Sequence, residues 1–205
     1  MNTVIAGVIL AGGRSRRMGG IDKAFIRLNG KPLIEWVIDR ISPQVERLYV
    51  NTNHQHEKYK GLGYPLIADT VGPDIGPLAG ILTGLESASS QYLLTAPCDV
   101  PLLPENLCAV LYRHLYETGA RAATIYDGDK LHPVISLLDC TLAASLHAYL
   151  KAGHRSVAGW LDSIGVLRVD FPGQHNAFLN VNTPDDLLYC NVFSGIGRVN
   201  SVTAW

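Results

Sequence analysis

A glycine-rich, basic segment at residues 12–23 carries the clearest chemistry in this sequence. It follows an apolar run that ends at Leu10, and its glycines let backbone N–H groups approach a polyphosphate closely. The cationic side chains of the segment are Arg14, Arg16, Arg17 and Lys23. In a chain whose formal net charge is -1, this local excess of positive charge predicts a phosphate-binding loop. The alternative is a solvated turn with surface arginines.

The segment matches neither of two familiar phosphate-binding motifs. It lacks the Gly-Lys-Ser or Gly-Lys-Thr ending of a Walker loop, and its glycines do not have the Gly-x-Gly-x-x-Gly spacing of a dinucleotide fold. Ser15, the serine of this segment, has no neighbouring base in the sequence that could activate it. Covalent catalysis is therefore not expected.

Asp99 follows a second apolar run, residues 92–96, and precedes Val100 and Pro101. This position predicts a carboxylate at the carboxyl edge of a sheet, where a triphosphate would lie. Mg²⁺ binds oxygen ligands and needs only one or two protein carboxylates when phosphates and water complete its shell. Asp99 is therefore a candidate Mg²⁺ ligand; the alternative is an Asp that caps the turn before Pro101.

Two further polar residues, Asn51 and Asp69, also follow short apolar runs. Their amide and carboxylate could read a nucleobase, although Asn and Asp are common in turns and a turn role is favoured on the residues alone. Near the C-terminus, Asn180 and Asn182 are two residues apart, so that on a strand both would point to the same face. His132 precedes a proline, which is typical of a loop residue.

The elements that must position these residues alternate along the chain. Strands are predicted from apolar runs at residues 4–10, 48–50, 66–68, 92–96 and 122–126. Helices are predicted from periodic apolar positions within residues 33–41, 78–85 and 107–115. This alternation predicts an α/β fold with a mainly parallel sheet and helices on both faces, and such sheets bind ligands at the carboxyl ends of their strands.

The second half of the chain is less regular. We expect a hairpin turn at Asp127-Gly128, a strand at residues 133–137 and a helix at residues 142–150. Thr183 and Pro184 predict a further helix start, with Thr as N-cap and Pro at the first helical position. No linker divides the sequence, so we predict one domain over residues 1–193, followed by a loosely ordered tail at residues 194–205.

Composition argues against several other classes of protein. The chain has 205 residues, 17% charged residues and no long basic run, which predicts neither nucleic-acid nor membrane binding. Its 4 cysteines are widely spaced and its histidines show no convergent spacing, so no zinc or redox motif is expected. The N-terminal apolar stretch is too short for a secretory signal, and a cytoplasmic location is expected.

Residues 10–23 closely resemble the opening pattern of the molybdenum cofactor guanylyltransferase family: Leu-Ala-Gly-Gly, then Ser or Ala, Arg-Arg-Met-Gly-Gly and Asp-Lys. Later family blocks are similar, in the same order, to residues 28–33, 76–80, 97–101, 132–133 and 180–184. The resemblance covers residues 4–190 and leaves the tail outside. Several ordered blocks are more specific than one loop motif.

The resemblance implies a three-layer α/β/α, Rossmann-like nucleotidyltransferase fold. It also implies an Mg²⁺-dependent enzyme that transfers GMP from GTP to the terminal phosphate of Mo-molybdopterin, releasing pyrophosphate and forming the guanine dinucleotide cofactor. Molybdoenzyme apoproteins or their chaperones are implied as further partners. The attacking phosphate is already ionised, so no general base is expected.

The resemblance assigns roles to matching positions of this sequence. The implied catalytic residues are Arg17, Lys23 and Asp99, and Asp99 is the implied metal ligand. The implied GTP-binding residues are Leu10, Ala11, Gly12, Gly13, Lys23, Asn51, Asp69 and Asp99. The implied acceptor-side residues are Gly76, His132, Asn180 and Asn182. Which residue reads the guanine edge stays open.

Gly12 distinguishes this chain from the related cytidylyltransferases, which carry Leu-Ala-Ala-Gly at the matching place. The missing methyl group favours the larger purine of GTP. Three alternatives remain: a cytidylyl or sugar-phosphate nucleotidyltransferase of the same fold, a nucleotide-binding regulatory module without catalysis, and a protein that delivers the cofactor to molybdoenzymes.

Overall fold

The computed structural model describes residues 4–11, 22–53, 57–72 and 75–196. Within these ranges, no helix combines the length and apolar character that crossing a bilayer requires. All four cysteines are free thiols, as their scattered spacing predicted.

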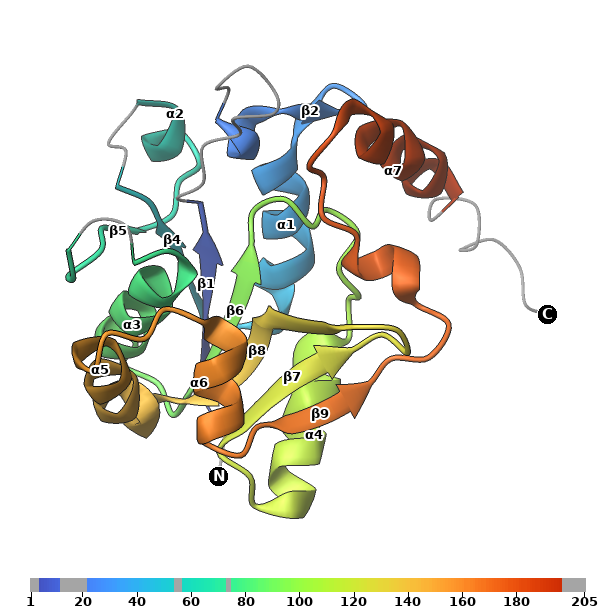
Figure 1. The fold of residues 1–205 in the computed structure, drawn as a ribbon. Coiled ribbons are helices and arrows are strands. Elements are labelled where there is room, and N and C mark those ends of the chain that lie inside the picture. Colours follow the sequence, from blue (N-terminus) through green and yellow to red (C-terminus); the bar gives the residue numbers. More distant parts are fainter. Residues whose placement is uncertain (1–3, 12–21, 54–56, 73–74, 197–205) are drawn as a thin grey trace.

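A seven-stranded sheet forms the centre of the molecule, in the order β5-β4-β1-β6-β8-β7-β9 (Figure 1). Its strands are β1 (Ile5–Leu10), β4 (Arg47–Asn51), β5 (Leu66–Ile67), β6 (Tyr92–Pro97), β7 (Ala122–Tyr126), β8 (Leu131–Asp139) and β9 (Leu167–Asp170). Strand β8 runs antiparallel to β6 and β7, and the other neighbouring pairs are parallel. The prediction of a mainly parallel sheet is confirmed. A short hairpin, β2 (Arg27–Leu28) and β3 (Lys31–Pro32), lies outside this sheet.

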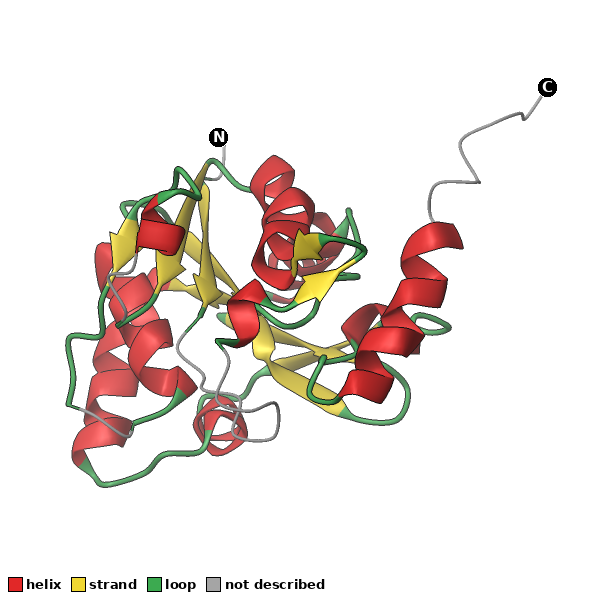
Figure 2. Ribbon diagram, turned by 90° about the horizontal axis from the view of Figure 1, so that it is seen from above, coloured by secondary structure: helices red, strands yellow, loops and turns green. Residues whose placement is uncertain are grey.

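Helices cover both faces of the sheet (Figure 2). They are α1 (Leu33–Ile41), α2 (Glu57–Lys60), α3 (Pro77–Ser87), α4 (Leu107–Thr118), α5 (Ala143–Lys151), α6 (Val157–Ser163) and α7 (Pro184–Ile196), with short 3-10 turns η2 (Lys23–Phe25), η3 (Ser42–Gln44), η4 (Cys140–Leu142) and η5 (His175–Phe178). Ile9 of β1 packs in a core with α1 and α4, whereas its neighbour Val8 packs in a second core with α3, α5 and α6. Because successive strand residues point to opposite faces, β1 is buried on both. The predicted three-layer architecture is confirmed.

Strand β1 lies where the order of the sheet reverses, with β4 on one side and β6 on the other. In register, Leu10 at the end of β1 pairs with Asn51 of β4 and with Pro97 of β6. The carboxyl ends of three strands therefore meet at one edge. In open α/β sheets this reversal point is where ligands bind.

The C-terminal segment returns to the N-terminal half of the chain. Val181 and Cys190 pack in a third core with Leu28 and Leu33. Helix α7 begins where it was predicted to begin and continues to Ile196, beyond the predicted domain boundary at residue 193. The rest of the predicted tail, residues 197–205, lies outside the described residues.

Candidate functional site

Lys23 and Asp99 meet at the carboxyl edge of the sheet, although they are 76 positions apart in the sequence. Lys23 opens η2, whose N-cap is Asp22; Oδ1 of Asp22 accepts a hydrogen bond from the N–H of Ala24 at 3.1 Å. Asp99 directly follows β6, and Nζ of Lys23 donates to its Oδ2 at 3.1 Å. The two side chains are 19% and 12% exposed, so water screens this ion pair less than one at the surface.

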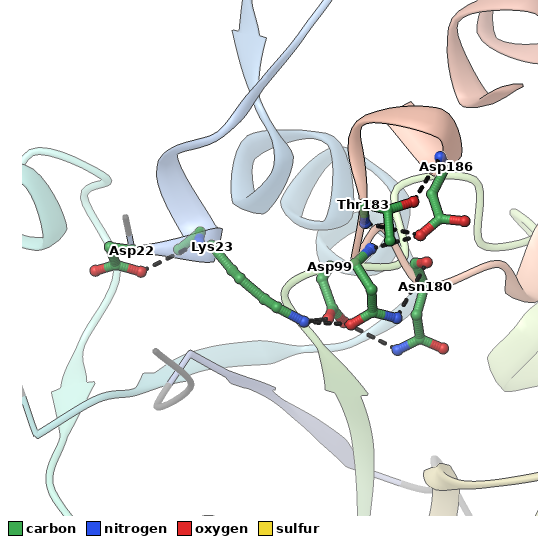
Figure 3. Close-up of polar contacts among 8 residues, drawn as sticks. Asp22, Lys23, Asp99, Asn180, Thr183 and Asp186 are labelled. Carbon is green, nitrogen blue, oxygen red and sulfur yellow. Dashed lines mark hydrogen bonds and ion pairs between the residues drawn. The ribbon is translucent and has the colours of Figure 1, made fainter. Parts of the chain in front are cut away.

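Asn180 and Asn182 reach the same ion pair from the other side. Nδ2 of Asn180 donates to Oδ1 of Asp99 at 3.1 Å, and Nζ of Lys23 also donates to Oδ1 of Asn182. Figure 3 shows Lys23 extending from η2 towards Asp99 and Asn180. The prediction that the two asparagines lie on a strand is wrong, since they occupy an irregular segment between η5 and α7. They still converge because the N–H of Val181 donates to the backbone oxygen of Asp99 at 2.8 Å.

Asp186 fixes the other end of this irregular segment (Figure 3). Its Oδ2 accepts the N–H groups of Asn182 and Thr183, each at 2.9 Å, while its own N–H donates to Oγ1 of Thr183 at 3.2 Å. This reciprocal cap starts α7. Burial alone would raise the pKa of Asp186, but the N–H of Asn182, the hydroxyl and N–H of Thr183 and the charge of Lys23 hold it below its ordinary value.

Asn51 and Asp69 form a second polar group, on the other side of the end of β1. Nδ2 of Asn51 donates to Oδ1 of Asp69 at 2.9 Å and to the backbone oxygen of Ile67 at 3.2 Å. Asn53, which the sequence did not single out, donates from Nδ2 to Oδ2 of Asp69 at 2.7 Å. Among the described contacts, each oxygen of the Asp69 carboxylate thus accepts one amide hydrogen, and a carboxylate has further lone pairs with which it can accept from a ligand.

Leu10, Ala11 and Gly80 shape the space beside Asn51. The N–H of Ala11 donates to the backbone oxygen of Asn51 at 2.8 Å, which extends the β1–β4 pairing by one step. A Cβ on Gly80 would lie 2.1 Å from Oδ1 of Asn51 and 2.8 Å from Cδ2 of Leu10. Only glycine therefore lets α3 approach this closely. Gly80 lies in one of the blocks of the resemblance, but no local signal in the sequence marks its role.

Two predicted acceptor-side residues, Gly76 and His132, are placed apart from Lys23. Gly76 precedes α3 with φ of 74°, a conformation that favours glycine. His132 lies on β8 and not in the loop that its place before a proline had indicated; it is 7% exposed, and its Nε2 is 2.7 Å from Oδ2 of Asp127. In the described part of the chain, no hydrogen bond joins either residue to Lys23 or Asp99.

A cleft of about 510 Å³ opens beside the start of α7. Its lining includes Asp127, His175, Phe178, Asp186 and Tyr189. Asp186 belongs both to this cleft and to the segment that carries Asn182. Asp186 therefore connects the cleft to the segment of the two asparagines, although Lys23 and Asp99 are not among the residues that line it.

Three predicted site residues, Gly12, Gly13 and Arg17, lie outside the described residues. Among the residues that are described, no group of three or more His, Cys, Asp or Glu side chains could hold a metal ion by itself. Asp99 nevertheless fits a Mg²⁺ ion whose other ligands are phosphate and water, because such sites need only one or two protein carboxylates. An ammonium, a carboxylate and two amides at the reversal point of the sheet can together hold a phosphate chain and a metal ion.

Comparison with known proteins identifies the family of the chain. The family described as "MobA-like NTP transferase domain" matches residues 7–164. A molybdenum cofactor guanylyltransferase from Yersinia pestis is 46% identical over 186 residues, which cover 91% of this chain and 94% of that protein. A protein of the same name from Yersinia pseudotuberculosis matches equally, at 46% identity over 91% of this chain and 94% of its own.

Solved structures share the fold. Molybdopterin-guanine dinucleotide biosynthesis protein A from Archaeoglobus fulgidus has a TM-score of 0.75 at 24% identity, covering 94% of this chain and 100% of that chain. A 4-diphosphocytidyl-2C-methyl-D-erythritol synthase from Anaerococcus prevotii has a TM-score of 0.72 at 14% identity, with 94% and 96% covered. With a family match over most of its length and relatives 46% identical along nearly all of it, the chain belongs to the MobA-like NTP transferases and, within them, to the molybdenum cofactor guanylyltransferases.

Proposed function

We propose that this chain transfers GMP from GTP to the terminal phosphate of Mo-molybdopterin, releasing pyrophosphate and forming molybdopterin guanine dinucleotide. Family membership supplies the class of reaction. The observation that carries the proposal is the convergence of Lys23, Asp99, Asn180 and Asn182 at one edge of the sheet. These residues come from three distant parts of the sequence, and together they offer the charge and hydrogen bonds that a triphosphate needs.

Asp69 is the residue that we propose reads the guanine base. The N1–H and 2-amino groups of guanine are two neighbouring donors, which a carboxylate can accept together. Asn51 and Asn53 hold both oxygens of Asp69, so the carboxylate is oriented before any ligand arrives. Leu10, Ala11 and the proposed GTP ligands Gly12 and Gly13 precede this group along the chain, and we propose that the nucleotide lies over the end of β1.

Asp99 is the residue that we propose binds Mg²⁺. From the described residues each of its oxygens accepts one hydrogen bond, from Lys23 or from Asn180, which leaves a further lone pair that a metal ion could use. When bound, the ion would neutralise negative charge on the phosphates. Lys23 adds a cation beside the same carboxylate, and we propose that Arg17 adds another from the basic segment.

The proposed work of the protein in the chemical step is to position the two substrates and to stabilise charge. The attacking group is an ionised phosphate, which needs no general base to remove a proton. Lys23 would contact the triphosphate as negative charge moves to the leaving pyrophosphate. Holding the attacking phosphate in line with the α-phosphorus would supply the rest of the rate acceleration.

We propose that the acceptor lies on the side of Asn180 and Asn182, where the cleft beside α7 opens. His132 is covered by the ring of Phe178, at 5.3 Å between centroids, and it contacts Asp127 in the lining of that cleft. Its proposed part on the acceptor side is therefore to orient Asp127. Gly76 has no side chain, so its proposed contact with the acceptor would be made by its backbone at the start of α3.

Radiolabelled nucleotide tests the proposal directly. The protein is incubated with GTP labelled at the α-phosphate, Mg²⁺ and an acceptor protein loaded with molybdopterin, and labelled pterin is isolated after denaturation. We expect label in the pterin with GTP and none with CTP. Label that follows CTP, or pyrophosphate release without a labelled pterin, would contradict the proposed substrates. A parallel reaction with EDTA tests the metal requirement.

A further inference from the structure

Tyr59 of α2 is fully buried, and its hydroxyl contacts two separate points near the site. Oη of Tyr59 lies 3.1 Å from the backbone oxygen of Ala11 and 2.8 Å from Oδ2 of Asp22. Ala11 extends β1, and Asp22 caps the turn that carries Lys23. In the sequence, these two residues flank the glycine-rich segment of residues 12–21.

Each of the two contacts is itself fixed by the sheet or by the cap. Ala11 is held by its N–H bond to the backbone oxygen of Asn51, at 2.8 Å. Asp22 uses Oδ1 to accept the N–H of Ala24, so that Oδ2 is left for Tyr59. In Figure 3, Asp22 and Lys23 extend from η2 in opposite directions. A contact at Asp22 therefore sets the orientation of the turn whose other side presents Lys23 to Asp99.

The surroundings of Tyr59 keep its hydroxyl protonated and its ring in place. Burial, the hydrogen bond to Asp22 and the charge of Asp22 raise the pKa of Tyr59 well above its usual value, although a hydrogen bond with Thr52 opposes them. The hydroxyl is therefore a donor at any physiological pH. Its ring packs edge-on against Phe25 of η2, at 4.8 Å between centroids. A phenyl ring at position 59 would keep this packing and lose only the hydroxyl.

We propose that Tyr59 is a positioning residue for the nucleotide: its hydroxyl shares its single proton between Asp22 and the backbone oxygen of Ala11, which ties η2 to the end of β1 and thereby sets Lys23 against Asp99. This inference rests on the proposed function, because it assumes that the triphosphate of GTP binds at Lys23. Tyr59 acts through Asp22 and Lys23. It lies too deep in the structure to touch the substrate itself, since none of its surface is exposed.

Tyr59→Phe tests the role, with Tyr49→Phe as a matched control. Tyr49 of β4 is also buried, at 7% exposed, and its hydroxyl donates to the backbone oxygen of Ser87 at 3.3 Å. Equilibrium dialysis with radiolabelled GTP and Mg²⁺ measures Kd for the wild type and for both variants. We expect Tyr59→Phe to raise Kd about tenfold, the effect of losing one hydrogen bond to a charged group, and Tyr49→Phe to leave it unchanged.

A second part of the experiment distinguishes a positioning role of Tyr59 from a general loss of protein stability in the variant. In a Lys23→Ala background, Tyr59→Phe should cause no further rise in Kd, because the group that it positions is gone. If Tyr59→Phe does not fold by circular dichroism, Asp22→Asn removes the same charged acceptor and is expected to weaken GTP binding similarly.

The outcomes distinguish this inference from the proposed function. A wild-type protein that binds no GTP would overturn the proposed function and, with it, the premise of the inference. If the wild type binds GTP and Tyr59→Phe has the same Kd, the role of Tyr59 alone is overturned. The same holds for an unchanged Kd in Asp22→Asn, if that variant has to replace Tyr59→Phe. Effects of Tyr59→Phe and Lys23→Ala that simply add would also overturn that role.

Discussion

Within the described part of the chain, Asp99 accepts one hydrogen bond on each carboxylate oxygen, from Lys23 and from Asn180. Asp99→Ala would remove the acceptor of both and the proposed metal ligand, and Lys23→Ala would remove the cation. Losing one preorganised electrostatic contact typically lowers kcat by a factor of about 100, or roughly 3 kcal/mol. We expect each variant to show a loss of this size in a steady-state transfer assay with saturating GTP.

Lys31→Ala is the control for these two variants. Lys31 pairs with Asp39 at the surface, where the side chains are 31% and 60% exposed, and such pairs contribute little. The turnover of Lys31→Ala should match that of the wild type. Near-normal turnover in folded Asp99→Ala would remove Asp99 from the mechanism. The double variant of Lys23 and Asp99 should lose less than the product of the single effects, because in the proposed mechanism the two residues act on the same phosphates.

The proposed contact between the Asp69 carboxylate and guanine leads to a separate prediction about which base the protein prefers. Asp69→Asn would replace one oxygen by an NH₂ group, which would face the amide donor of Asn51 or of Asn53. Inosine triphosphate lacks the 2-amino group of GTP but keeps N1–H. We expect the wild type to prefer GTP to inosine triphosphate about tenfold or more, and Asp69→Asn to lose most of that preference, because a charged acceptor is lost.

Competition between the two nucleotides measures this preference within one protein, so a general loss of affinity cancels. Glu86→Gln is the matched control. Glu86 accepts a hydrogen bond at 3.1 Å from Oγ1 of Thr70, the residue that follows Asp69 in the sequence. Its preference for GTP should be unchanged. If Asp69→Asn loses affinity for GTP and for inosine triphosphate by the same factor, this carboxylate does not bind the 2-amino group.

Helix α3 contributes to the site through a glycine. A methyl group on Gly80 would meet Oδ1 of Asn51 at 2.1 Å, so Gly80→Ala must displace Asn51 or the helix. Either movement disturbs Asp69, which Asn51 holds, and we expect Kd for GTP to rise about tenfold, the effect of losing a hydrogen bond to a charged group.

Gly84→Ala, one turn further along α3, is the control. The atoms nearest to its new methyl group would belong to apolar side chains, Leu93 at 2.9 Å and Val8 at 3.1 Å. Both substitutions improve intrinsic helix propensity by up to about 1 kcal/mol, and both crowd the core. Melting temperatures should therefore change in both variants, whereas GTP affinity, measured by equilibrium dialysis, should fall only in Gly80→Ala. Equal affinities would mean that the position of Asn51 is unimportant for binding.

The elements of this fold were predictable where local pattern decides them. The apolar periodicity of residues 33–41 predicted α1 with the bounds that the structure has, and the run at residues 92–96 predicted β6 one residue short of its end. Helix α6 was missed, although Ser156 caps it and Val157, Trp160 and Leu161 have helical spacing. Strand β9 was missed because four residues at the edge of a sheet give only a weak alternation.

The site was predictable only in part, for a different physical reason. Lys23, Asp99 and the asparagines were predicted from strand ends and from ordered family blocks, which the sequence displays. The contacts that orient them join residues distant in the chain, as Tyr59 joins Asp22 across 37 positions. No local pattern records such a contact, because it depends on how α2 packs against η2.

The whole fold, by contrast, does not determine the substrate. The 4-diphosphocytidyl-2C-methyl-D-erythritol synthase from Anaerococcus prevotii, whose name contains another nucleotide, shares this architecture with a TM-score of 0.72. The order of the sheet fixes where a nucleotide binds, and the side chains at the strand ends fix which nucleotide it is. We propose that in this chain those side chains are Asn51, Asn53 and Asp69, which lie on the opposite side of β1 from Asp99.

The stability of the whole molecule should depend on acid through Asp127 at the β7–β8 turn. Burial alone would raise the pKa of Asp127, but the N–H groups of Lys130 and Asp129 and the ring of His132 hold it well below its usual value. A depressed carboxyl pKa contributes stability that is present above the unfolded value of about 3.9 and is lost as pH falls through the folded pKa. Unfolding free energy should therefore drop steeply below about pH 4.

Asp127→Asn separates this contribution from general acid denaturation. Its amide oxygen can still accept the N–H groups of Asp129 and Lys130, which donate to Oδ1 at 2.9 Å, but the charge facing His132 is gone. We expect the variant to be less stable than the wild type at pH 7 by about 1 to 3 kcal/mol, and the gap to narrow towards pH 2. Urea titrations at several pH values measure both, with Asp39→Asn as an exposed control. Parallel pH profiles for the wild type and Asp127→Asn would show that the buried carboxylate does not link protonation to folding.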